Sequence, residues 1–147
     1  MQNSIFNTTY ENSFRILIML SLLKEATSDK LSALDFIVIY GKSFEVSEEN
    51  LHGENEFNFG EFALRRKNMS EALKMLVLNG LVTVKNGENG FNYTISSNGL
   101  NMCENMSTGY AKEYKLIAMK AVQNYGSMNE LELLETVTKK SMDHLRR

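Results

Sequence analysis

Basic side chains form the most distinctive chemical pattern in this chain. The run Arg65-Arg66-Lys67 is followed by Lys74, and all four residues fall within one amphipathic segment. Basic residues gathered on a helix are typical of proteins that bind phosphates. At 100° per residue, however, Arg66 shares a stripe with the apolar Phe62. Lys67 and Lys74 fall on the opposite side, so the pattern predicts a divided cluster and not one phosphate-binding patch.

The two parts of this cluster have different predicted roles. An inward-pointing Arg66 needs a carboxylate partner, and Asp35 or a loop glutamate meets that need in a structural ion pair. Lys67 and Lys74 are predicted to form an outward surface for nucleic acid or a partner protein, which Lys85 on the following hairpin extends. An ordinary solvated helix face explains these lysines equally well.

Groups suited to catalysis or metal binding are scarce. The sequence contains no P-loop, dinucleotide glycine fingerprint, HExxH or CxxC motif. Its one cysteine, Cys103, is most simply a small apolar filler. His52 stands near Glu54 and Glu56, but three groups on an asparagine-rich loop are a weak metal signal, and a turn-stabilising histidine explains them better. We therefore predict no catalytic residue, no metal and no cofactor, and expect that the protein is not an enzyme.

Composition narrows the class of protein further. The net charge is −2 and the pI is about 5.7, so there is no general excess of positive charge for binding DNA. Apolar residues make up 43% of the 147 residues, which suits one folded domain with an appendage. No apolar run approaches the roughly 18 residues of a membrane span, and the first residues lack a basic signal-peptide region. These features predict a cytoplasmic protein that does not enter the membrane.

The segment from Glu61 to Ser96 organises the predicted fold. Apolar residues recur at helical spacing up to Gly80, which predicts one long amphipathic helix. Two alternating segments follow, Leu81–Lys85 and Phe91–Ile95, and the connector between them contains two Asn-Gly pairs, a strong hairpin signal. A helix followed by such a wing is typical of the second half of a winged helix-turn-helix.

The remaining segments are predicted to be mostly helical. The fold class is therefore mainly α with a small β-hairpin wing: a winged helix-turn-helix plus C-terminal helices. Residues 1–98 are predicted to form the winged-helix domain, and residues 99–147 a helical extension. The other predicted helices are Tyr10–Ala26, Lys30–Tyr40, Ser96–Asn105, Tyr110–Tyr125, and a last helix that begins at a capping box formed by Ser127 and Glu130 and buries Leu131, Leu134 and Val137.

The segment at 42–60 is a long acidic loop with scattered apolar residues. It is about five times longer than the turn of roughly 3–4 residues in a DNA-binding helix-turn-helix. Long loops anchored by apolar side chains often carry function. Leu51, His52 and Phe57 are therefore the candidate residues for contact with a partner protein.

Four stretches of the sequence resemble the small middle component of bacterial ABC three-component systems. They are LDFIVIYGKSF, NLHGENEFNFGEFALRRKNMSEALKMLVLNGLV, GFNYTISSNG and YAKEY, and they extend over roughly Tyr10 to Tyr125. The LHGEN loop and the EFALRR helix start are the more specific parts. The hairpin stretch is common to winged helices in general.

This resemblance implies a function. Such a middle component is a winged-helix subunit encoded between an ABC ATPase of the SMC, RecF or Rad50 kind and an effector, in systems that include Lamassu-like defence against phage or plasmids. It would be a non-catalytic adaptor on the ATPase, comparable to the winged-helix ends of kleisins, and could contact DNA within the complex. The alternative is a winged-helix transcriptional regulator that dimerises through its C-terminal helices. An enzyme or toxin with its site at His52 is the least favoured hypothesis.

Overall fold

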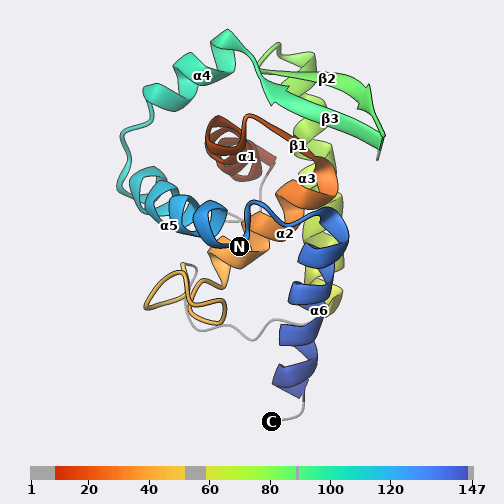
Figure 1. The fold of residues 1–147 in the computed structure, drawn as a ribbon. Coiled ribbons are helices and arrows are strands. Elements are labelled where there is room, and N and C mark those ends of the chain that lie inside the picture. The colour runs from red at the N-terminus through yellow and green to blue at the C-terminus, as the bar shows by residue number, and fades with distance from the viewer. Residues whose placement is uncertain (1–8, 52–58, 89, 146–147) are drawn as a thin grey trace.

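The computed structural model describes residues 9–51, 59–88 and 90–145. Helices dominate, and three short strands form one antiparallel sheet at one end of the molecule (Figure 1). A mainly helical fold with a small hairpin is thus confirmed. The elements are α1 (Thr9–Leu23), β1 (Glu25–Thr27), α2 (Ser28–Ile39), α3 (Phe59–Leu78), β2 (Val82–Gly87), β3 (Gly90–Ile95), α4 (Ser97–Glu104), α5 (Gly109–Tyr125) and α6 (Glu130–Leu145).

The first helix ends earlier than the sequence predicts. α1 stops at Leu23, because Lys24 takes a left-handed backbone conformation with φ 75° that reverses the chain. The next three residues form strand β1, which the sequence did not reveal because three residues are too few to show alternation. Thr27 then caps α2, and its hydroxyl oxygen accepts a hydrogen bond from the backbone N–H of Lys30.

The two central helices confirm their predictions. α2 is helical despite its β-branched and aromatic end, because residues 31–40 are buried on every side. Burial all round removes the preference of such residues for a half-exposed strand. α3 ends at Leu78, and the chain leaves it through Gly80, whose φ of 74° is a conformation that favours glycine.

The sheet has the strand order β1-β3-β2, with both pairs antiparallel. In the β2–β3 hairpin, Val82 pairs with Ile95 and Val84 with Tyr93, so the predicted alternation is confirmed. β1 adds a third strand, with Ala26 opposite Tyr93. The chain segment between α1 and α2 is therefore tied to the hairpin by backbone hydrogen bonds.

The last helix begins two residues later than its predicted capping box. Asn129 and Glu132 form the box: the N–H of Asn129 donates to Glu132 Oε1 at 3.0 Å, and the N–H of Glu132 donates to Asn129 Oδ1 at 2.8 Å. The predicted box of Ser127 and Glu130 is wrong, because Glu130 is already the first helical residue. This register buries Leu133 and leaves Leu131 66% exposed.

α2 is the centre of the packing. It contacts α1, α3, α5 and α6, and Figure 1 shows these helices arranged around it. Of the described residues of α6, Leu133 and Val137 are fully buried. Among the described residues, none of the helices combines the length and the apolar character that crossing a membrane would require.

A buried ion pair lies where α1, α2 and α5 meet. Arg15 and Asp35 are each 1% exposed, and their Nε and Oδ1 atoms are 3.0 Å apart. The hydroxyl of Tyr114 on α5 donates to the same Oδ1 atom at 2.7 Å, and Asn12 accepts a hydrogen bond from the Arg15 guanidinium. Burial acts to lower the pKa of Arg15, but the nearby Asp35 carboxylate raises it above its ordinary value. The guanidinium therefore stays charged.

Removing the carboxylate from this pair should destabilise the fold strongly. Asp35→Ala leaves the Arg15 charge buried without its partner, which costs about 3–5 kcal/mol of unfolding free energy. Tyr114→Phe removes one hydrogen bond to the Asp35 carboxylate but leaves the ion pair in place, and should cost less, about 1.5–3 kcal/mol. Urea denaturation followed by circular dichroism measures both, and equal losses for the two variants would contradict this account.

The stability should also fall at high pH. Burial raises the pKa of Tyr110, beside Arg15, to about 12, from 10.0 for an ordinary tyrosine. Between these values the unfolded chain loses the phenol proton while the folded chain keeps it, so the unfolding free energy decreases as pH rises from about 10 towards 12. Denaturation at both pH values tests this, and Tyr110→Phe should show a shallower decrease. An unchanged slope in Tyr110→Phe would assign the effect to other groups.

Candidate protein-interaction surface

The inner face of α3 holds the helix against the core. Phe62, Met69, Leu73 and Leu76 are at most 3% exposed, which confirms the predicted apolar stripe. The ring of Phe62 stands edge-on to that of Phe36 on α2, with centroids 5.2 Å apart. This packing fixes which side of α3 faces outward.

The basic run on α3 is divided, but not as predicted. Arg66 reaches Asp29 in the first turn of α2, with Nη2 and Oδ1 2.7 Å apart and both side chains about two-fifths exposed. The predicted pair of Arg66 with Asp35 is wrong, because Asp35 faces α1 and α5 and is already paired with Arg15. The partner of Arg66 is thus a carboxylate of α2, but this carboxylate lies in the first turn of α2 and not in the buried middle of that helix.

Arg65 is the member of the run that turns inward. It is 8% exposed, and its Nη2 atom donates to Glu61 Oε1 at 3.3 Å. Its guanidinium also lies over the ring of Tyr40, 6.0 Å from the centroid. Burial, together with the hydrogen bond to Glu61, raises the pKa of Tyr40 above its ordinary value, so this phenol stays protonated.

The outer face of α3 consists of Leu64, Lys67, Glu71, Lys74, Met75 and Leu78. All six are exposed, and this confirms the predicted outward position of the two lysines. The exposed fractions are 58% for Leu64, 49% for Met75 and 83% for Leu78. The exposure of Leu64 and Met75 was not predicted from the sequence. The spacing of seven between Leu64, Glu71 and Leu78 is the signal that could have found this face.

The lysines of this face are not neutralised within the described part of the chain. No ion pair there involves Lys67 or Lys74. Glu71 lies between them, one helical turn from each. The face therefore carries two lysines, one glutamate and three large apolar side chains.

The β2–β3 hairpin presents apolar side chains, and its lysine Lys85 is paired. Lys85, a predicted contact residue, forms an ion pair with Glu25 of β1, with Nζ and Oε1 2.8 Å apart. Val84 is 42% exposed and Phe91 is 60% exposed. A hairpin that binds DNA would keep its cations free for phosphates, so the paired Lys85 offers little charge for such a contact.

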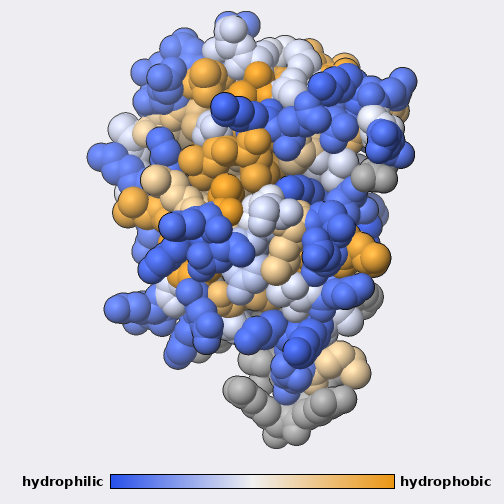
Figure 2. All heavy atoms as spheres, viewed as in Figure 1, coloured by the Kyte–Doolittle hydropathy of each residue, from blue (hydrophilic) through white to orange (hydrophobic). Residues whose placement is uncertain are grey.

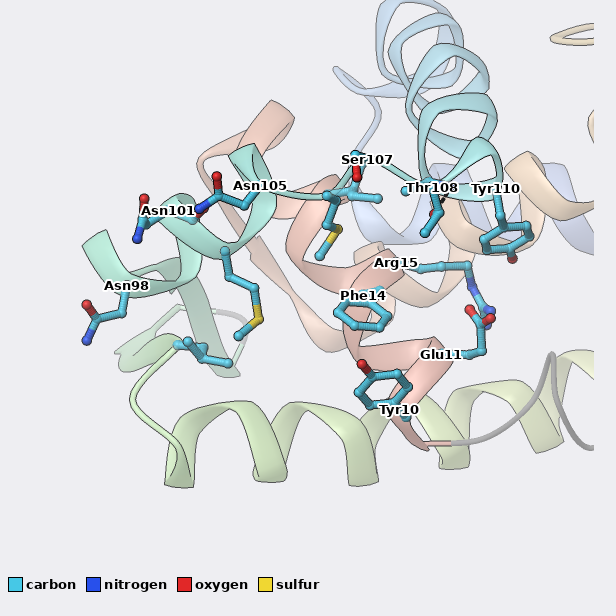
Figure 3. A pocket seen from close by; sticks show the side chains of 15 residues that line it. Tyr10, Glu11, Phe14, Arg15, Asn98, Asn101, Asn105, Ser107, Thr108 and Tyr110 are labelled. Atoms are coloured by element: carbon cyan, nitrogen blue, oxygen red, sulfur yellow. Dashed lines mark hydrogen bonds between the residues drawn. The ribbon is translucent and has the colours of Figure 1, made fainter.

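A groove of about 980 Å³ lies between α1, α4 and the start of α5 (Figure 3). Its lining includes Phe14, Met102 and Met106, together with Asn98, Asn101 and Asn105 at α4. Figure 2 shows an apolar patch over α1 in the middle of this face. Glu11 and Arg15 carry the charges of the lining. So little positive charge makes the groove unsuitable for phosphate groups.

Comparison with models of protein families identifies the family of this chain. The model for middle component 2 of ABC three-component systems matches residues 5–147. This chain belongs to that family. The resemblance seen in the sequence is therefore confirmed, and membership implies an adaptor role in a multi-protein system. In comparisons with curated proteins and with solved structures, nothing matches the chain.

The predicted contact residues of the loop are only partly described in this middle component. Leu51 is half-buried against the core, and its N–H donates to the carbonyl oxygen of Ile39 at 3.1 Å. His52 and Phe57 lie outside the described residues. Their role in partner contact stays a prediction.

The outer face of α3 should contribute little to the stability of the folded chain. Leu78→Ala removes a side chain that is 83% exposed, so the unfolding free energy should change by less than about 0.5 kcal/mol. Leu73→Ala, on the inner face and 1% exposed, should cost about 2–5 kcal/mol. Urea denaturation compares the two. A large loss in Leu78→Ala would mean that this side chain is covered.

Proposed function

We propose that this middle component is a non-catalytic adaptor subunit of a bacterial defence system against phage or plasmids. It docks on an SMC- or Rad50-like ABC ATPase and links it to an effector. The proposal rests on the exposure of large apolar side chains on the outer face of α3, namely Leu64, Met75 and Leu78. Burying one such side chain completely contributes about 1.5–3 kcal/mol, so a protein partner would gain from covering them.

The proposal includes a winged helix-turn-helix as the docking module. Its support is the element order α1-β1-α2-α3-β2-β3 together with the strand order β1-β3-β2. In this arrangement α3 takes the position of the recognition helix and the β2–β3 hairpin that of the wing. The outer face of α3 is thus the surface that a DNA-binding relative would use for bases.

A DNA-binding regulator is the second candidate. Lys67 and Lys74 support it, because they are exposed on the helix that would enter a groove. Three observations favour the adaptor: Glu71 lies between the lysines, Lys85 is paired with Glu25, and the net charge is −2. Phosphate neutralisation dominates DNA affinity, and these groups offer little of it. A weak DNA contact within the complex is compatible with the adaptor role.

Co-expression with the ATPase and the effector encoded beside its gene tests the proposal. The three proteins should elute together in size-exclusion chromatography with ATP present, because the exposed apolar side chains are buried in the complex. Separate elution with and without ATP would overturn the adaptor role.

A DNA-binding assay separates the two candidates. The isolated protein should not change the fluorescence anisotropy of a labelled duplex of its own promoter, even at about 50 mM salt, where electrostatic binding is strong. Tight, sequence-specific binding, weakened as salt rises to about 200 mM, would favour the regulator.

A further inference from the structure

We propose that the outer face of α3 binds one α-helix of a partner protein, and that this helix carries carboxylates opposite Lys67 and Lys74. The inference rests on the proposed adaptor function and specifies the chemistry of the partner. It depends on the spacing, the charges and the apolar ends of this face.

Spacing on α3 is that of a helix-binding surface. Leu64, Glu71 and Leu78 are seven residues apart, and so are Lys67 and Lys74. Seven residues make about two turns and advance about 10 Å along the axis, so each set forms a nearly straight line. Two parallel lines of this kind match the side-chain rows of a second helix laid along the first.

Charge on the same face selects the partner. Lys67 and Lys74 have no ion pair within the described part of the chain. Two carboxylates seven residues apart on a partner helix could therefore pair with them. Glu71 stands in the line beside them, where the continuous negative charge of a nucleic acid would be repelled. A partner helix can place its few acidic residues away from Glu71. The phosphates of a DNA backbone are continuous, so some of them would lie close to the Glu71 carboxylate.

Apolar residues stand at both ends of the face. Leu64 lies near the start of α3. Leu78 is the last residue of the helix, and Met75 lies one turn before it. All three side chains are exposed. A partner helix that covers both ends therefore needs large apolar side chains at its own two ends. The groove between α1 and α4 offers no comparable selection, because among the described residues that line it only Glu11 and Arg15 are charged, and Arg15 is already paired with Asp35.

Charge reversal in the three-protein complex tests the inference. Lys67→Glu combined with Lys74→Glu should weaken assembly with the ATPase and effector by about ten- to a hundredfold, measured by biolayer interferometry, because attraction becomes repulsion. The matched control is Lys112→Glu combined with Lys120→Glu, which reverses two exposed lysines on α5. This control should assemble like the wild type, and circular dichroism should show both variants folded.

A photo-crosslinking residue in place of Leu78 identifies what lies on the face. Crosslinks within the assembled complex should map to one helical segment of the ATPase or effector that carries two acidic residues seven apart. Reversal of those two residues to lysine should restore assembly with the Lys67→Glu, Lys74→Glu variant.

Several outcomes would overturn the inference. Wild-type affinity of the Lys67→Glu, Lys74→Glu variant would exclude this face while leaving the adaptor function intact. Crosslinks to added DNA, or to a partner segment that is not helical, would also exclude a helix as the occupant. Failure of the wild-type proteins to assemble would remove both the inference and the proposed function.

Discussion

The buried ion pair between Arg15 and Asp35 is the constraint on which the packing depends. Taking two charges out of water costs several kcal/mol for each, so the pair persists only if further hydrogen bonds complete it. Asn12 and Tyr114 supply those bonds. Tyr114 lies 79 residues beyond Asp35 along the chain, so this one carboxylate holds α1, α2 and α5 in a fixed arrangement. This hydrogen bond thereby ties α5 to the buried core.

The ion pairs of the surface are separate from this buried pair. Asp35 faces α1 and α5, and Arg66 of α3 pairs with Asp29 near the surface. Inner-face packing of α3 leaves Lys67 and Lys74 pointing outward beside exposed leucines. This face therefore combines two exposed lysines and a glutamate with three large exposed apolar side chains. Membership of the middle component 2 family gives a reason for it, since such a protein works among other proteins.

Sequence patterns revealed the elements whose signals are local. The α3 stripe from Phe62 to Leu76, the stop at Gly80 and the β2–β3 hairpin all follow from periodicity and turn chemistry, which act within a few residues. The same patterns missed β1, because a three-residue strand is defined only by its pairing with β3. They also misplaced the capping box of α6, which Asn129 and Glu132 form two residues later than predicted.

By itself, then, the sequence determined a mainly helical chain with a hairpin, and its motifs were sufficient to indicate the family. The tertiary structure alone decided which charges meet. Helical geometry placed Arg66 in the apolar stripe, and the burial of Arg65 in its place depended on Tyr40 and Glu61. The partner of Asp35 was equally undetermined, because an ion pair between distant residues depends on how whole helices pack. Local sequence patterns describe neighbouring residues only, so they do not predict which distant side chains pair.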